Sequence, residues 1–152
     1  MVRAIALATL VAGTLDIAFA MILTVTFGGK IGNMLRYVGS GPFPAATEMG
    51  SAGAIIGLVT HFTLIAVMAA IFVFAAWRRS VLVEKPVTWG ILYGLATYFV
   101  MNWIVVPMRF DTPLPLRPLL IATQLSAHIL LVGIPVALVA ARRMRSAAFH
   151  RK

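Results

Sequence analysis

The sequence lacks cysteine altogether and has little charge of either sign. Charged residues make up 11% of its 152 residues, against roughly 25% in an ordinary soluble domain. Without cysteine the chain cannot form disulfides, thiolate metal sites or a cysteine nucleophile. It also has no carboxylate pair, no glycine-rich phosphate loop after a strand and no elbow-type nucleophile motif. These absences favour a non-enzymatic protein and leave the question of an enzyme open.

What the chain has in abundance is apolar sequence. Hydrophobic residues make up 61% of it, more than a soluble fold of this length can bury, so we expect lipid to be the solvent for much of the surface. The net charge is +9, from 13 Lys and Arg against four Asp and Glu. The basic residues flank the apolar runs, which predicts attraction to anionic lipid head groups through the loops and tail rather than binding to nucleic acid.

Four apolar runs are each long enough to cross a bilayer. They predict an all-α fold, an integral membrane four-helix bundle formed by a single domain of residues 1–145, followed by a basic cytoplasmic tail at 146–152. Between the first two spans, we expect a short interfacial helix at 31–38 that turns Lys30 and Arg36 toward lipid head groups. Gly133 and Pro135 should kink the fourth span. The expected spans are, to within a few residues, 4–27, 51–77, 87–107 and 119–141.

The distribution of Lys and Arg predicts how these spans are oriented. With four spans both termini lie on one side, and that side carries nine Lys and Arg against four on the other. The positive-inside rule therefore places both termini in the cytoplasm. The nine are Arg3, Arg78, Arg79, Lys85, Arg142, Arg143, Arg145, Arg151 and Lys152, and the four are Lys30, Arg36, Arg109 and Arg117.

Three ionisable side chains fall inside the predicted spans. His61 lies ten residues after Ser51 and His128 ten residues after Pro118, so each is roughly 15 Å from the outer end of its span. Asp16 is near the middle of the first span. Because a charge at this depth is costly unless it has a partner, we expect the three to face one another or a common cavity. Three further polar residues, placed nearer the outer surface, would support this site: Asn102, Gln124 and Ser126.

Small residues recur at helical spacing on the same spans, as they do where membrane helices pack closely. In the first two spans they share a stripe with Asp16 or His61, so we expect them to mark the faces that look toward the polar centre. A second pair opens the third span, four residues apart. The glycines of these stripes are Gly13, Gly53, Gly57, Gly90 and Gly94.

Four interpretations of the polar centre are open. His61 and His128 could be the axial ligands of a b-type haem, with Gly57 leaving room for the porphyrin and propionates met on the outer side by Arg36, Arg109 or Arg117. The two histidines with Asp16 could bind a divalent metal. They could form a proton or cation path. Finally, the three side chains could pair with one another and hold the helices in register. In that case the protein would serve to hold a partner.

These interpretations lead to three functional hypotheses. The first is a non-enzymatic membrane protein whose polar centre binds a small ligand or ion, haem included. The second is an accessory or structural subunit that packs its small-residue faces against a larger membrane complex or against another copy of itself. The third is a membrane enzyme, electron carrier or proton-linked transporter, which needs a bound cofactor or a conducting site.

Short motifs from residue 60 onward resemble those of a known family, the YagU-like small inner-membrane proteins of bacteria, over roughly residues 60–145. The resemblance implies a four-span protein of the bacterial inner membrane, and the family has no established biochemical activity. Asn102 stands where some members have histidine, which puts in doubt any site that needs a third histidine. The motifs are Thr60-His61, Trp89-Gly90, Val106-Pro107 and Ala127-His128.

Overall fold

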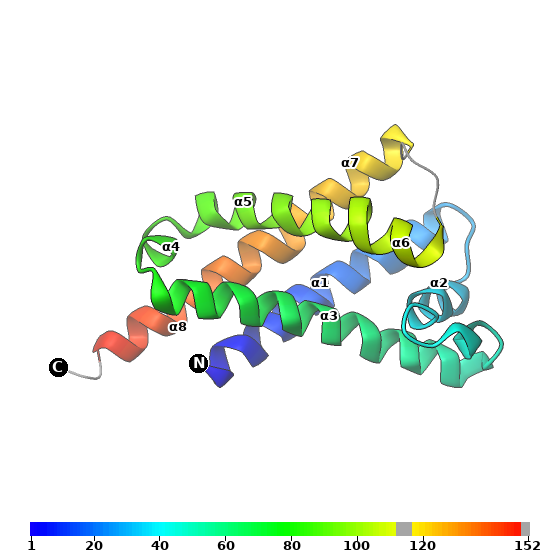
Figure 1. Ribbon diagram of the computed structural model, residues 1–152, viewed down its shortest axis with the longest axis horizontal. Helices are drawn as coiled ribbons and strands as arrows, with labels where there is room; N and C mark the ends of the chain where they lie inside the picture. Colours follow the sequence, from blue (N-terminus) through cyan, green and yellow to red (C-terminus); the bar gives the residue numbers. More distant parts are fainter. Residues whose placement is uncertain (112–116, 150–152) are drawn as a thin grey trace.

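A computed structural model describes residues 1–111 and 117–149 of the chain, with side chains as far as Arg145. The chain is 89% helical, and its described residues contain no strand. Four long helices run side by side, and both termini lie at one end of the bundle, called here the terminal end (Figure 1). The all-α four-helix bundle predicted from the sequence is thereby confirmed. The long helices are α1 (Val2–Thr26), α3 (Gly50–Arg78), α5 with its continuations (Pro86–Phe110), and α7 with its continuations (Pro118–Phe149).

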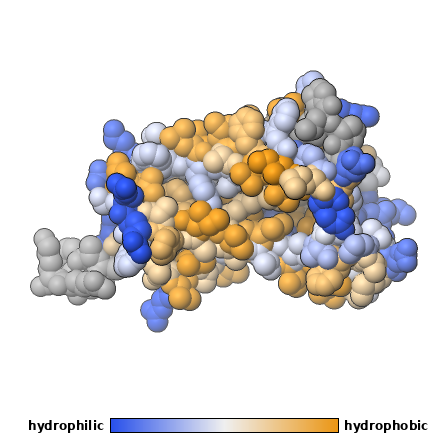
Figure 2. Space-filling model, in the orientation of Figure 1, coloured by the Kyte–Doolittle hydropathy of each residue, from blue (hydrophilic) through white to orange (hydrophobic). Residues whose placement is uncertain are grey.

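Each long helix has the length and composition of a membrane span. Spans of 25, 29, 25 and 28 residues have mean hydropathies of 2.1, 2.3, 1.5 and 1.9, and about 20 apolar residues suffice to cross the hydrocarbon core. Large apolar side chains point outward, among them Ile22, Ile55 and Val59. Figure 2 shows this hydrophobic surface as a band, with hydrophilic residues gathered toward both ends. The chain therefore has the build of a multi-pass membrane protein.

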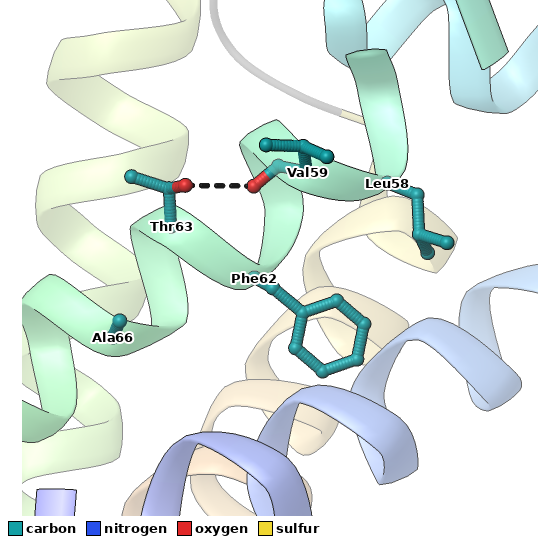
Figure 3. Close-up of a pocket in the computed structure, with 5 residues that line it drawn as sticks. All are labelled: Leu58, Val59, Phe62, Thr63 and Ala66. Carbon is teal, nitrogen blue, oxygen red and sulfur yellow. Dashed lines mark hydrogen bonds between the residues drawn. The ribbon is translucent and has the colours of Figure 1, made fainter. Parts of the chain in front are cut away.

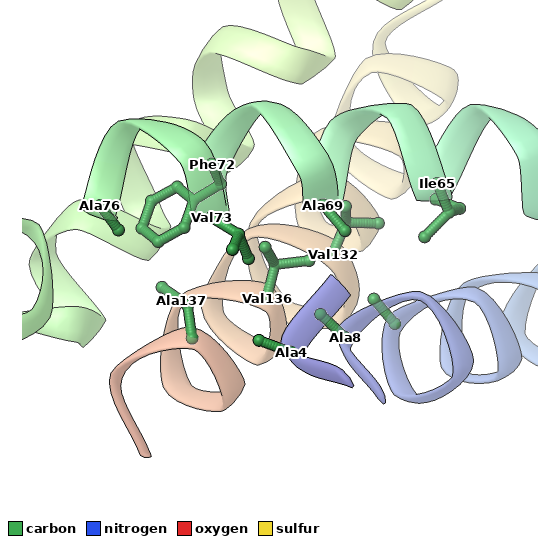
Figure 4. Packing of buried hydrophobic residues seen from close by; sticks show 12 residues of the cluster. Ala4, Ala8, Ile65, Ala69, Phe72, Val73, Ala76, Val132, Val136 and Ala137 are labelled. Carbon is green, nitrogen blue, oxygen red and sulfur yellow. The ribbon is translucent and has the colours of Figure 1, made fainter. Parts of the chain in front are cut away.

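The hydrophobic core lies toward the terminal end and is built largely of alanine. Ala8, Ala69 and Val136 are fully buried there, where α1, α3 and the fourth long helix meet. Figure 4 shows these short side chains pointing toward one another from three helices. Small side chains let the helices approach closely, which is how helices pack when lipid removes the hydrophobic drive between them. The adjoining α5 is joined to α3 by a hydrogen bond of 2.7 Å from the Tyr93 hydroxyl to the Met68 carbonyl.

The third and fourth long helices touch through their backbones at three glycines. A Cβ on Gly133 would lie 2.2 Å from the Gly90 carbonyl oxygen, and one on Gly94 would lie 2.5 Å from the His128 carbonyl oxygen. Any side chain would force these helices apart, because the neighbouring atoms belong to the backbone and cannot move alone. Gly90 and Gly94, expected on a packing face, therefore lie against the fourth helix.

Both of these helices widen into π-helical turns at matching places. The π segments are η2 (Val100–Val105) and η3 (His128–Gly133), and each is followed by a hydrophobic residue and then a proline, Pro107 or Pro135. A proline lacks the amide proton and its ring clashes with the carbonyl four residues earlier, so the helix must rearrange just before it. The expected kink at Gly133 and Pro135 thus takes the form of a π turn, and η2 passes into α6 (Val106–Phe110), which carries the third span beyond the expected end.

Two short elements connect the first two spans, α2 (Ile31–Gly39) and the 3₁₀ turn η1 (Pro44–Thr47). The short helix expected at 31–38 is present as α2, and its place in the membrane interface stays a prediction. It packs along α3 and buries Leu35 and Gly39. The reason is steric, because α3 presents glycines where the segment touches it. A Cβ on Gly57 would lie 1.8 Å from the Leu35 carbonyl oxygen, and one on Gly53 would lie 1.9 Å from that of Ala46. A short helix, α4 (Val81–Glu84), connects α3 to α5 at the terminal end.

Candidate functional site

The structure brings together the three ionisable residues that the sequence singled out. Asp16 on α1 and His61 on α3 approach with 3.9 Å between Oδ2 and Nδ1, and their side chains are 20% and 11% exposed. His128, the first residue of η3, is close enough for Asp16 to interact electrostatically with both histidines. The group lies between three helices in the middle of the bundle. It is therefore a shielded cluster of one carboxyl and two imidazoles.

His61 is held by the backbone of α1. Its Nε2 lies 3.0 Å from the carbonyl oxygen of Gly13, and because a carbonyl can only accept a hydrogen bond, Nε2 must carry the proton. In a neutral ring, Nδ1 is then left with a lone pair, and Nδ1 is the atom that faces Asp16. Gly13 is buried, and a Cβ there would lie 2.6 Å from the Phe62 ring, so glycine gives α3 the room to approach this carbonyl.

His128 is held through its other ring nitrogen, Nδ1, by a carbonyl of its own helix. Its Nδ1 lies 3.0 Å from the carbonyl oxygen of Gln124, one turn earlier, so Nδ1 donates and Nε2 carries the lone pair. Each histidine thus has one nitrogen fixed by a backbone carbonyl and the other available to accept a proton. The two fixed nitrogens are of different kinds, Nε2 in His61 and Nδ1 in His128.

The three polar residues expected to support the site contribute unequally. Asn102 is buried, and its Nδ2 donates 3.3 Å to the carbonyl oxygen of Tyr98. Gln124 contributes its carbonyl oxygen to His128, whereas Ser126 is exposed and points away from the bundle interior. The stripe glycines of α3, Gly53 and Gly57, face α2 and η1 rather than Asp16 and His128.

One aromatic residue next to the cluster was missed by sequence reasoning. Tyr98 is 2% exposed, its ring packs edge-on against that of His128 at 6.0 Å between centroids, and its hydroxyl accepts a hydrogen bond of 3.3 Å from Trp103 Nε1. The available signal was its place one turn before Asn102. The carbonyls of Gly13 and Gln124 were also missed, because no side-chain pattern marks a backbone acceptor.

The residues present do not fit a haem held by the two histidines. Nε2 of His61, the usual iron ligand, is committed to the Gly13 carbonyl. The space expected beside Gly57 is filled by the backbone of Leu35. Arg109, one of the expected propionate partners, donates to the carbonyls of Ser40 and Gly41 instead. The geometry therefore gives a porphyrin neither the Nε2 of His61 nor a slot beside that histidine.

A divalent metal is not favoured by the arrangement either. A metal ion in such a site needs three or more side-chain ligands within coordination distance. Across residues 1–111 and 117–149, no three His, Asp or Glu side chains converge in this way. Asp16, His61 and His128 are thus near enough to interact electrostatically, but they do not form a coordination sphere.

A shallow hollow on α3 lies apart from this cluster. It is lined by Leu58, Val59, Phe62, Thr63 and Ala66, all from one side of α3, and Phe62 extends from it toward α1 (Figure 3). The hydroxyl of Thr63 is already bonded to the Val59 carbonyl at 2.8 Å. The hollow is apolar and opens to the outside of the bundle, where lipid is expected.

Comparison of the chain with protein-family models, with curated proteins and with solved structures finds no match. The resemblance to the YagU-like family thus stays a prediction. The functional argument rests on the chemistry of the cluster itself.

Proposed function

We propose that this is a multi-pass protein of the bacterial inner membrane, with both termini in the cytoplasm, whose Asp16–His61–His128 cluster takes up and releases a proton. The observation that carries the proposal is the fixed tautomer of His61. Its Nε2 is bound to the Gly13 carbonyl, so the lone pair of Nδ1 faces the carboxylate of Asp16 at 3.9 Å.

Two acceptors that face each other in a shielded site repel unless a cation lies between them. A proton on Nδ1 turns the contact into an ion pair, and a proton on Asp16 turns it into a neutral donor–acceptor pair. The 3.9 Å separation is longer than a direct hydrogen bond, so one water can bridge the two atoms. Since no three carboxyl or imidazole groups of the described chain converge closely enough to hold a metal ion, the pair favours a proton over a divalent metal.

His128 supplies a second acceptor within the electrostatic range of the same carboxylate. Its Nε2 has the lone pair, because Nδ1 donates to Gln124. Histidine changes charge near neutral pH, and aspartate–histidine chains inside membrane helices are a usual means of moving protons. The proton that Asp16 and His61 share can therefore pass to His128 as the cluster or its water rearranges.

Two further observations support the membrane orientation. Both termini lie at one end of the bundle (Figure 1), and the sequence assigns nine Lys and Arg residues to that side against four to the other. Under the positive-inside rule the richer side faces the cytoplasm.

Proton flux into liposomes tests the proposal. Purified protein is reconstituted, a pH gradient is imposed, and the internal pH is followed with a trapped dye. We expect Asp16→Asn to lower the flux by about tenfold or more, because an uncharged amide cannot balance a proton on histidine. The matched control is Glu84→Gln, which makes the same change of charge at an exposed residue of α4, outside the spans.

Full flux in Asp16→Asn would contradict the proposal. So would a wild-type flux no greater than that of empty liposomes, and that result would favour the structural role for the cluster. Ring-nitrogen NMR gives a second readout. In the wild-type protein Nε2 of His61 should carry a proton and Nδ1 should face the carboxylate, whereas in Asp16→Asn the amide can donate to Nδ1 and hold the ring neutral.

A further inference from the structure

The segment between the first two spans is bounded by two glycines in the left-handed region. Gly28 has φ +75° and Gly50 has φ +56°, and nothing lies within 4 Å of where a Cβ would stand on either. These are left-handed conformations that other residues rarely adopt, and they place a turn at each end of the segment. Residues 28–50, called here the plug, thus run from the glycine after α1 to the first glycine of α3.

The plug is seated on α3 directly beyond the polar cluster. Leu35 and Gly39 of α2 lie against Gly57, which precedes His61 by one helical turn on the same face of α3. The plug also touches α1, the helix that carries Asp16. It thus occupies the end of the bundle opposite the termini, where α2 lies against the first half of α3 (Figure 1), between that end and the level of His61.

One arginine ties the plug to the third span. Arg109 on α6 donates from Nη2 to the Ser40 carbonyl at 2.6 Å and from Nε to the Gly41 carbonyl at 2.5 Å. Tyr37 of α2 stacks on Phe110 beside it, with 4.4 Å between ring centroids. A guanidinium suits this place, since the carbonyls at a helix C-terminus are unpaired and carry the negative end of the helix dipole. Because both hydrogen bonds of Arg109 are accepted by backbone carbonyls, they can break and re-form without a rearrangement of plug side chains.

We propose that the plug is a gate that controls access to the Asp16–His61–His128 cluster from the end opposite the termini, and that Arg109 is its latch. The proposal rests on the proposed function, since it assigns to the proton site the route by which one side of the membrane reaches it. Opening would swing residues 28–50 about Gly28 and Gly50 and expose the buried face of α2. The alanine-packed terminal end stays closed during this movement.

Thiol labelling tests the gate, because the chain has no cysteine of its own. Two reporters are made separately, Leu35→Cys on the buried face of the plug and Asn102→Cys in the interior of the third span. Each is combined with Arg109→Ala, and a membrane-impermeant thiol reagent is added on the plug side of reconstituted liposomes. The matched control is Arg117→Ala, which removes one exposed positive charge at the start of α7.

We expect Arg109→Ala to raise the labelling rate of both reporters by about tenfold or more, because charge-assisted hydrogen bonds of this kind shift a two-state equilibrium by at least that factor. Arg117→Ala should change neither rate. Arg109→Lys, which can reach one carbonyl but not both with fixed geometry, should give intermediate rates. It also serves as the test variant if Arg109→Ala does not fold.

Unchanged labelling in folded Arg109 variants would overturn the latch. A faster reaction at Leu35→Cys with none at Asn102→Cys would show a plug that moves without opening the interior, and would overturn the gate. Labelling does not depend on proton uptake, so the two proposals fail separately. Normal proton flux with unchanged labelling contradicts the gate alone, and absent flux with the expected labelling contradicts the proton site alone.

Discussion

The two ends of this bundle use small residues in different ways. At the terminal end, buried alanines from α1, α3 and the fourth long helix meet directly, and side chain packs against side chain. At the opposite end, α3 uses Gly53 and Gly57 to seat the plug, and backbone packs against backbone. The alanine contacts join spans that are continuous through the bundle, as the contacts of Gly90 and Gly133 also do, whereas Gly53 and Gly57 hold a short segment with a glycine at each end. Under the proposed gate, the terminal end is fixed and the opposite end moves.

The largest expected effect is at the glycines that join the third and fourth spans. Gly133→Ala would place a Cβ 2.2 Å from the Gly90 carbonyl, and because both neighbours are spans, we expect the free energy of unfolding in detergent to fall by about 3 kcal/mol or more. Thermal unfolding followed by tryptophan fluorescence measures this. A fall in the free energy of unfolding no larger than about 0.5 kcal/mol, as for an ordinary surface substitution, would show that this contact is not tight.

Gly57→Ala is the corresponding change at the plug. The clash is at least as severe, with the new Cβ 1.8 Å from the Leu35 carbonyl, but the plug can swing away. We therefore expect faster hydrogen exchange in α2 while the amides of residues 65–76 keep their protection. Gly32→Ala is the control, because its Cβ would have nothing nearer than 3.8 Å. Global unfolding by Gly57→Ala would remove the distinction between the two ends.

Overpacking the alanine core should have an intermediate effect. Ala8 is fully buried, so Ala8→Leu must push α1 away from its neighbours, and we expect a cost of about 1–3 kcal/mol in the free energy of unfolding. The exposed Ala6 on the same helix is the matched site, since Ala6→Leu adds the same atoms toward lipid. Equal stability of the two variants would show that the core at the terminal end is looser than its packing indicates.

A smaller effect is expected where α5 meets α3. Tyr93→Phe removes the hydroxyl that donates to the Met68 carbonyl at 2.7 Å and leaves the ring in place against Phe72. Hydrogen bonds between membrane helices contribute about 0.6 kcal/mol on average, and we expect a loss of that order in detergent unfolding. A loss of several kcal/mol would mean that this bond, rather than the alanine core, holds the terminal end together.

A similarly small effect on stability is expected at the proline that follows η3. Pro135→Ala restores a backbone donor, so the π turn at His128–Gly133 can return to α-helix with a change of about 1 kcal/mol or less. The change should be measured at His128, because conversion of the π turn to α-helix rotates this residue relative to Asp16. We expect the ring-nitrogen NMR signals of His128 to shift while those of His61 stay in place. Unchanged His128 signals would show that the π turn does not set the position of this ring.

Much of the fold could be predicted from the sequence. Four apolar runs, their turns and the all-α class follow from composition and length, since spanning a bilayer demands about 20 apolar residues whatever they pack against. The kink at Pro135 could also be predicted from the local sequence, because a proline removes a backbone donor from any helix in which it stands. The π turn before Pro107 could have been inferred in the same way, but the third span was expected to end there.

The candidate site was predicted in part. The common depth of Asp16, His61 and His128 follows from counting residues along helices, and the structure brings these residues together. The haem and metal interpretations depended on what surrounds them, and Gly57 shows why counting was not enough. Its place on the same stripe as His61 suggested space for a ligand, whereas the space is taken by α2.

By itself, the sequence determined which residues lie deep in the apolar spans, which side carries the excess of Lys and Arg, and where small residues allow close approach. These are properties of single helices, which hydropathy and helical spacing describe. Only the tertiary structure decided which neighbour fills each glycine contact, that Arg109 ties down α2, and which nitrogen of each histidine has the lone pair. Those outcomes depend on backbone carbonyls contributed by other parts of the chain, and every residue type supplies the same carbonyl.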